Sequence, residues 1–125
     1  GVDLRPHETH SASDWAGIFD TVLKNNQVIL HFQETVMWTQ RPMLPVRLYE
    51  TLMRLYVDET TMIQAGIFVP MAEQLELMVS LDQLAIEKII NKIQTGNESI
   101  LYFVNISPST LDNPVFTEWV LEKIK

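Results

Sequence analysis

Residues 100–106 (ILYFVNI) constrain the fold of this chain more than any other segment. Nearly all of them are apolar, which is typical of a strand buried on both faces in a parallel sheet. Residues 80–95, just before this run, carry apolar side chains at helical spacing, and Gly96-Asn97 is a good helix end. A helix followed by a buried strand favours an α/β fold with a parallel sheet.

The other periodic segments predict the remaining elements. Strand composition predicts an antiparallel hairpin of two strands, at residues 28–38 and 44–57. Helical patterns or helix-start signals predict further helices at residues 14–25, near 59–65, from Pro70 in a first turn onward, and at 114–124. Ser13-Asp14 and Ser80 are the expected helix caps. Three strands are too few to close a barrel, so we expect the front half of one.

Composition sets limits on the class of protein. A chain of 125 residues is long enough for one compact domain, which we place at residues 13–125 after a polar linker or tail at residues 1–12. The net charge of −7 argues against nucleic acid as a partner. There is no cysteine and no apolar run of the ~18–20 residues that a membrane span needs. Because the chain starts at Gly1 and stops inside a predicted helix, we expect a piece of a longer protein.

The segment from Tyr49 to Arg54 carries the clearest chemical signal. Glu50, Leu52 and Arg54 alternate, so on a strand all three side chains point to one face. Asn105 comes directly after the apolar run Ile100–Val104 of a second predicted strand and can add an amide oxygen. Carboxylate and amide oxygens are ligands for Mg²⁺ or Mn²⁺, and a guanidinium can bind a phosphate through two hydrogen bonds. The pattern is suited to a metal ion and a phosphate.

Four segments together resemble the EAL domain family, the phosphodiesterase and receptor domains of cyclic di-GMP. They appear in the family's order and cover nearly the whole chain from Trp15 onward: His31-Phe32-Gln33, Glu50-Thr51-Leu52-Met53-Arg54, Phe68-Val69-Pro70-Met71-Ala72-Glu73 and Val104-Asn105-Ile106-Ser107-Pro108. The family has Tyr-Gln-Pro, Glu-Ala-Leu-x-Arg, Phe-Ile-Pro-x-Ala-Glu and Val-Asn-Leu-Ser-x at these places. Glu34 therefore replaces a proline and Thr51 an alanine.

The resemblance implies the N-terminal portion of a modified (β/α)8 barrel, truncated, whose first strand runs antiparallel to its neighbours. It implies that Glu50 and Asn105 are metal ligands for Mg²⁺ or Mn²⁺, and that Gln33, Leu52 and Arg54 contact cyclic di-GMP. The family's further carboxylates and its lysine, on later strands, are not in this chain. We therefore expect that this piece does not catalyse hydrolysis, although the parent protein can be an active phosphodiesterase or a degenerate receptor. Thr51 and Glu34 slightly favour the receptor.

Each candidate residue also has a simpler interpretation. Glu50 and Arg54 can form an ion pair on an exposed strand face. Asn105 can be an amide at a strand end, and Gln33 a half-buried strand amide. Glu73, the weakest candidate, can be a helix residue whose charge favours the first turn.

The resemblance also indicates partners and location. We expect an upstream GGDEF or sensor domain in the parent, and a cytoplasmic protein whose anchoring to the inner membrane through another domain is left open. The alternative function is a protein–protein interaction or regulatory module without a nucleotide role. An unpaired third strand and an apolar interior favour a homo-oligomer under either hypothesis.

Overall fold

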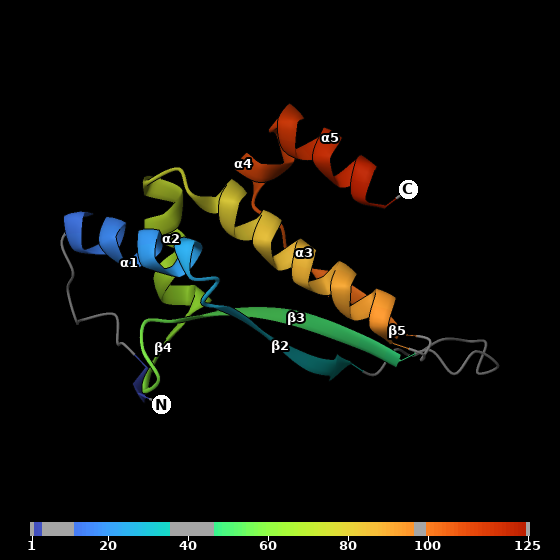
Figure 1. Cartoon of the computed structure of the whole chain (residues 1–125), viewed down its shortest axis with the longest axis horizontal. Helices are drawn as coiled ribbons and strands as arrows, with labels where there is room; N and C mark the ends of the chain where they lie inside the picture. The colour runs from blue at the N-terminus through green and yellow to red at the C-terminus, as the bar shows by residue number, and fades with distance from the viewer. Residues whose placement is uncertain (1, 4–11, 36–46, 97–99, 125) are drawn as a thin grey trace.

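The computed structural model describes residues 2–3, 12–35, 47–96 and 100–124, which form a sheet with helices on one side (Figure 1). The elements are β1 (Val2–Asp3), α1 (Ala12–Lys24), β2 (Val28–Thr35), β3 (Arg47–Tyr56), β4 (Thr61–Gln64), α2 (Ala65–Gln74), α3 (Met78–Thr95), β5 (Ile100–Val104), α4 (Pro108–Leu111) and α5 (Pro114–Lys123). None of the described helices is both long and apolar enough to cross a membrane.

Strand β3 is the centre of the sheet. One of its edges pairs along its length with β2 in antiparallel register, which confirms the predicted hairpin. Its other edge is divided between two strands. β5 pairs in parallel with Arg47–Thr51, and β4 pairs antiparallel with Arg54–Tyr56. The parallel pairing of β3 with β5, joined through α2 and α3, confirms the α/β class.

The helix expected near residues 59–65 is wrong, because Thr61–Gln64 is the strand β4. Asp58 causes the chain to turn back, since its Oδ1 accepts hydrogen bonds from the Thr60 N–H, the Thr60 hydroxyl and the Thr61 N–H, all at 2.8 Å. These bonds, led by that from the Thr60 backbone, lower the pKa of Asp58. Here this side-chain turn joins β3 to β4, whose residues pair antiparallel with Arg54–Tyr56.

Helix α2 also begins earlier than expected. Pro70 lies inside α2 and not in its first turn, so the Gly66 carbonyl has no backbone N–H donor four residues later. Ser13, Asp14 and Ser80 likewise lie within the first turns of helices that begin at Ala12 and Met78, and are not caps.

The prediction that β5 is buried on both faces is also wrong. Its exposure alternates, and Leu101 and Phe103 are each 53% exposed. The other face lies under α3, where Tyr102 packs against Phe32 and Tyr49 with ring centroids 5.4 and 6.1 Å away. β5 is apolar on both faces, but the described helices cover one of them.

At the N-terminal end, Val2–Asp3 pairs in parallel with β4, so this part of the predicted tail belongs to the sheet. The ends of the predicted hairpin at residues 36–46, including Pro45, lie outside the described residues.

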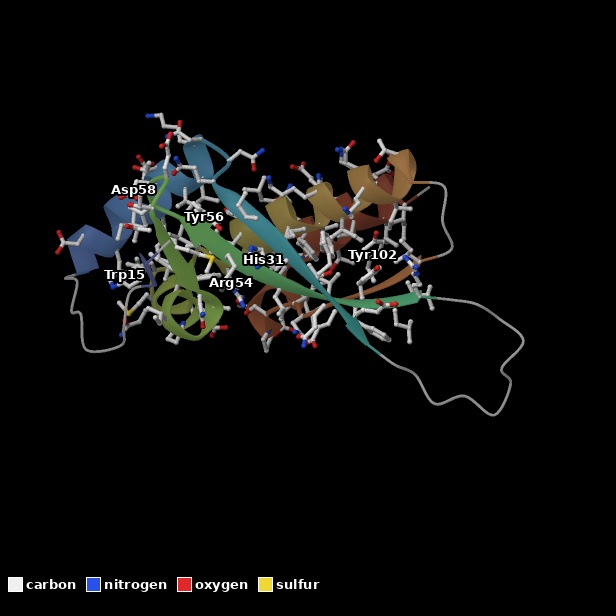
Figure 2. The ribbon with its side chains drawn as sticks, turned by 90° about the horizontal axis from the view of Figure 1, so that it is seen from below. Trp15, His31, Arg54, Tyr56, Asp58 and Tyr102 are labelled. Atoms are coloured by element: carbon white, nitrogen blue, oxygen red, sulfur yellow. The ribbon has the colours of Figure 1, made fainter. Side chains whose placement is uncertain are left out.

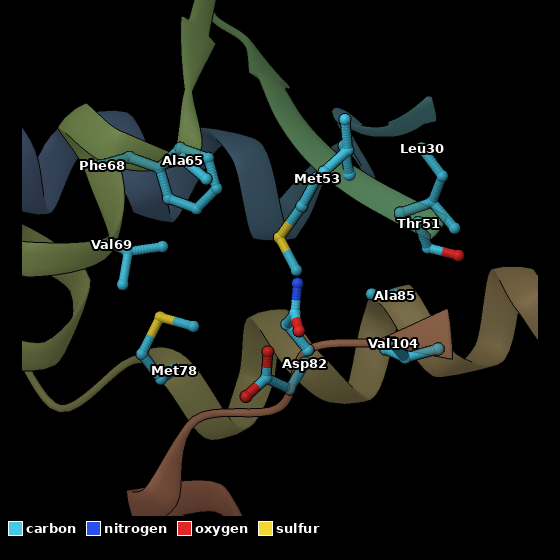
Figure 3. A pocket seen from close by; sticks show the side chains of 12 residues that line it. Leu30, Thr51, Met53, Ala65, Phe68, Val69, Met78, Asp82, Ala85 and Val104 are labelled. Carbon is cyan, nitrogen blue, oxygen red and sulfur yellow. The ribbon is translucent and has the colours of Figure 1, made fainter. Parts of the chain in front are cut away.

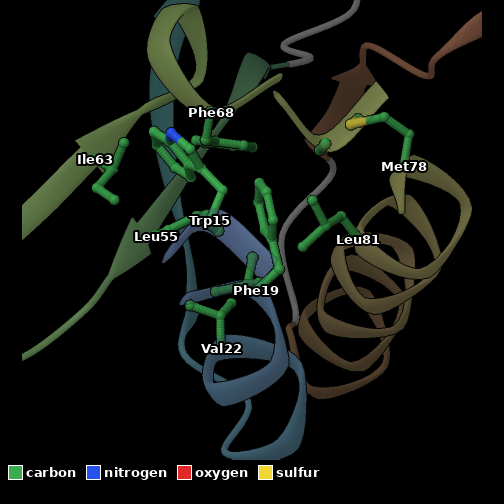
Figure 4. Close-up of a cluster of buried hydrophobic side chains, with 10 residues drawn as sticks. Trp15, Phe19, Val22, Leu55, Ile63, Phe68, Met78 and Leu81 are labelled. Carbon is green, nitrogen blue, oxygen red and sulfur yellow. The ribbon is translucent and has the colours of Figure 1, made fainter. Parts of the chain in front are cut away.

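The main hydrophobic core lies where α1, α2 and the start of α3 meet the sheet (Figure 4). Trp15 and Phe19 stack with ring centroids 5.6 Å apart. Phe19, Leu55, Ile63 and Phe68 are fully buried. The core therefore lies at one end of the sheet, on the side that the helices cover.

We predict that Leu55→Ala lowers the free energy of unfolding by about 2–5 kcal/mol, because it leaves a cavity in this core. The matched control is Ile93→Ala on α3, whose side chain is 53% exposed. It should change the free energy of unfolding by less than about 0.5 kcal/mol. Urea denaturation followed by circular dichroism measures both, and equal losses would contradict the placement of the core.

Candidate functional site

The strand register places the predicted site residues on one face of the sheet. Gln33 is paired with Glu50, which is in turn paired with Phe103, so these three side chains form a row across β2, β3 and β5. Side chains of directly paired residues lie on the same face of a sheet, and in an antiparallel pair such as Gln33 and Glu50 the Cβ atoms are about 4.5–5.5 Å apart. A carboxylate, an amide and an aromatic ring are therefore neighbours.

Two more rows continue along the same face. His31 is paired with Leu52, and Ile29 with Arg54, which is in turn paired with Gln64 of β4. Glu50, Leu52 and Arg54 are half-buried, whereas His31 and Gln33 are exposed. We call Gln33, Glu50, Leu52, Arg54 and Asn105 the polar-face residues. Figure 2 shows His31 and Arg54 on this side, with the strands in front of α3.

Asn105 follows the end of β5, at the division in the edge of β3. Val104 pairs with Thr51, so Asn105, the next residue, lies beside Leu52. At this point β5 ends, and β4 does not pair with β3 until Arg54. Asn105 is exposed and lies between the levels of Glu50 and Arg54.

The Arg54 side chain is held close to the strand. Its Nη1 donates a hydrogen bond to the Met53 carbonyl at 3.0 Å, and the side chain is half-buried. The remaining N–H groups of the planar guanidinium suit two oxygens of an anion such as a phosphate.

Glu73 lies elsewhere. It is on α2, and its Oε1 accepts a hydrogen bond from the Ser107 hydroxyl at 3.0 Å. Its described contact is therefore with the segment after Asn105. Because α2 begins at Ala65, Glu73 is near the end of the helix, and the first-turn interpretation is wrong.

Sequence reasoning missed the buried carboxylate that supports this segment. Asp82 of α3 is 2% exposed, and its Oδ2 accepts hydrogen bonds from the Ser107 N–H at 3.1 Å and the Thr110 hydroxyl at 2.6 Å. Burial raises the pKa of Asp82, the two hydrogen bonds oppose the shift, and the charge of Glu73 adds to it. A possible signal was its place beside Leu81 and Ala85 on the apolar side of α3.

A cavity of about 110 Å³ lies between the sheet and helices α2 and α3 (Figure 3). Its wall is mostly apolar, with Thr51, Asp82 and Asn105 as the polar members. Thr51 is 6% exposed, and its hydroxyl has no hydrogen-bond partner among the described residues. Thr51, which stands where the resembled motif has an alanine, thus places a buried hydroxyl without a described hydrogen-bond partner directly behind the polar face.

We predict that Thr51→Val raises the free energy of unfolding by about 1 kcal/mol, because it removes an unpaired buried hydroxyl at nearly constant volume. The same change at Thr110, which is fully buried and donates a hydrogen bond to Asp82, should lower it by about 1.5–3 kcal/mol. Chemical denaturation of both variants measures the two signs. A loss of stability in Thr51→Val would show that its hydroxyl is paired in solution.

Two of the polar-face residues carry oxygen donors. Glu50 and Asn105 provide a carboxylate and an amide oxygen, which suit Mg²⁺ or Mn²⁺. No group of three His, Cys, Asp or Glu side chains that could hold a metal occurs among the residues that the structure describes. A metal ion at Glu50 and Asn105 therefore needs oxygen ligands from water, a phosphate or another chain segment.

A known protein family matches most of the chain. The model of the EAL domain matches residues 17–125. The chain belongs to the EAL domain family. This match confirms the resemblance carried by the four sequence segments. No curated protein sequence matches the chain.

Solved EAL structures share the fold of this EAL domain. The FimX EAL domain of Pseudomonas aeruginosa bound to c-di-GMP is 22% identical, with a TM-score of 0.78 over 89% of this chain. Vibrio cholerae LapD, an S helix-GGDEF-EAL structure bound to c-di-GMP, is 17% identical, with a TM-score of 0.76 over 96% of this chain. The PaMucR phosphodiesterase in its c-di-GMP complex is 21% identical, with a TM-score of 0.70 over 88% of this chain.

This EAL domain spans less than half the length of those structures. It covers 44% of the FimX chain, 28% of the LapD chain and 45% of the MucR chain. The described elements therefore correspond to part of an EAL barrel. The antiparallel pairing of β2 with β3 agrees with the antiparallel first strand that the resemblance implied.

Proposed function

We propose that this EAL domain binds cyclic di-GMP on its polar face, within a bacterial signalling protein. The observation that carries the proposal is the register of β2, β3 and β5, which brings Gln33, Glu50 and Arg54 to one face of the sheet, with Asn105 beside Leu52. The FimX, LapD and MucR structures of the same fold were determined with c-di-GMP, which supports the choice of ligand.

Each polar-face residue has a chemical role in this proposal. Arg54 donates hydrogen bonds to a phosphate of the ligand, and Gln33 binds the nucleotide through its amide. Leu52 provides apolar contact between them. Glu50 and Asn105 donate oxygen ligands to a Mg²⁺ or Mn²⁺ ion, which when bound neutralises phosphate charge and polarises the P–O bond.

We propose binding, and not hydrolysis, as the activity of these 125 residues. Hydrolysis by two metal ions requires a larger set of ligands than Glu50 and Asn105. Whether a longer parent protein hydrolyses the ligand depends on residues outside this sequence. An upstream GGDEF or sensor domain and a cytoplasmic location belong to the same proposal, and LapD is a protein that carries GGDEF and EAL in one chain.

Calorimetric titration with cyclic di-GMP, in Mg²⁺ and in EDTA, tests the proposal. Binding to the unaltered chain should be tighter in Mg²⁺, because Glu50 and Asn105 then hold a cation beside the phosphate. Arg54→Ala should weaken binding roughly 10–100-fold, since it removes hydrogen bonds to a charged group.

The matched control is Arg47→Ala. Arg47 is exposed on the same strand. It is seven residues before Arg54, and because side chains alternate along a strand it lies on the opposite face. Its removal should leave the affinity unchanged. Equal losses in the two variants would reduce the interaction to general charge attraction, and no binding by the unaltered chain would refute the proposal for these residues.

The exposed side of β5 favours a second function, the association of two copies of this chain as an interaction module. Leu101 and Phe103 are each 53% exposed on this strand. Within the described part of the chain β5 pairs only with β3, so its outer edge presents free backbone groups. An apolar edge strand of this kind is a template for pairing with another chain.

We predict that the chain forms a dimer or larger oligomer by size-exclusion chromatography with light scattering, and that Leu101→Lys shifts it toward the monomer. Leu121→Lys is the control, because Leu121 of α5 is 54% exposed but lies away from the sheet edge. Arg54→Ala should leave the association intact, which separates it from ligand binding. A monomer in the unaltered chain would contradict this second function.

A further inference from the structure

We propose that Asp82 is a positioning residue for Asn105, acting through Ser107 from behind the polar face. This inference rests on the proposed function for its consequence, but its structural part can be tested without any ligand. Asp82 itself does not reach the ligand, because it is 2% exposed and its Oδ2 is hydrogen-bonded to Ser107 and Thr110.

The burial of Asp82 is costly and needs an explanation. A carboxylate is rarely buried to this degree unless it is paired. Both hydrogen-bond donors to Asp82, the Ser107 N–H and the Thr110 hydroxyl, are neutral groups. An apolar side chain at this place would avoid the cost of burying a charge. We therefore take the role of Asp82 to be the position in which its hydrogen bonds hold the chain at Ser107 and Thr110.

That geometry acts on the three residues between β5 and α4. Val104 is fixed by its pairing with Thr51 in the sheet. Ser107 is fixed by Asp82 through its N–H and by Glu73 through its hydroxyl. Asn105 and Ile106 are the residues between these two fixed points, so the backbone that carries the Asn105 amide has little freedom.

Ser107 also connects this support to the next helix. Its carbonyl accepts hydrogen bonds from the Thr110 and Leu111 N–H groups, each at 3.0 Å, at the start of α4. Its hydroxyl lies 2.9 Å from that of Ser109. Helices α2, α3 and α4 therefore all meet at one residue, two positions after Asn105.

Asp82 and Asn105 also line the same cavity, together with Thr51 and Val104. Figure 3 shows Asp82, Thr51 and Val104 around it. A group behind a metal or phosphate ligand that holds it in one orientation changes affinity without touching the bound species. Removal of such a supporting group typically costs 10–100-fold in metal affinity.

The test compares Asp82→Ala with Asp82→Asn in the full 125-residue chain. Nuclear magnetic resonance reports the Asn105 side-chain amide signals and the hydrogen exchange of the Ser107 N–H, and calorimetry reports affinity for cyclic di-GMP in Mn²⁺. Asparagine keeps an acceptor oxygen for Ser107 and Thr110, so Asp82→Asn should retain slow exchange and near-normal affinity. Asp82→Ala should expose the Ser107 N–H, shift the Asn105 signals and weaken binding about tenfold.

Ile89→Ala is the control for a general loss of stability. Ile89 is buried on the same helix, two turns after Asp82, and takes no part in the hydrogen bonds described for Ser107. It should lower the stability of the fold and leave the Asn105 signals in place. If Asp82→Ala does not fold, Asp82→Glu keeps the carboxylate but moves it by one methylene, and should shift the Asn105 signals in a folded protein.

The outcomes separate the two proposals. Unchanged Asn105 signals and Ser107 exchange in Asp82→Ala, or in Asp82→Glu where the alanine variant does not fold, would overturn the inference. Shifted signals in a chain that never binds cyclic di-GMP would support the positioning role and refute the proposed function. Shifted signals with unchanged affinity would overturn the link between Asp82 and binding.

Discussion

The pairing of β3 with its neighbours is the constraint on which the rest of the structure depends. Because side chains alternate along a strand, a slip of one residue between β2 and β3 would move Glu50 and Arg54 to the helix side and expose Leu55. The burial of Leu55 in the main core therefore holds the polar residues on the opposite face. The hydrophobic core and the candidate site depend on the same register.

The outer edge of β3 is divided between β5 and β4, and this division leaves a gap in the strand pairing at the candidate site. A strand edge paired along its whole length would leave no gap beside Leu52. Here the pairing of β5 ends at Val104, and the chain continues toward α4. Asn105 is the first residue outside the sheet, next to the segment that carries the alternating Glu50, Leu52 and Arg54. The buried carboxylate of Asp82 holds the chain at this exit, on the helix side of the sheet.

Several sequence predictions are confirmed because they depend on local patterns. The period of apolar residues in 80–95 marked a real helix, and the turn-separated strands formed the antiparallel hairpin. The order of the four segments identified the EAL family. The ligand roles of Gln33, Glu50, Leu52, Arg54 and Asn105 stay predictions. The helix predicted near residues 59–65 is wrong, because the turn at Asp58 brings this segment back as a strand. A turn made by a side-chain hydrogen bond leaves little periodic signal in the sequence.

The sequence by itself determined the class of fold, the family and the shared face of Glu50, Leu52 and Arg54, since each follows from residue order and the two-residue period of a strand. Only the tertiary structure decided that one face of β5 is exposed, that Glu73 binds Ser107 and not the polar face, and that Asp82 supports the segment after Asn105. The physical reason is distance along the chain. The hydrogen bonds from Ser107 and Thr110 to Asp82 span 25 and 28 residues, and they form only when the parallel pairing of β3 and β5 brings α3 beside the end of β5.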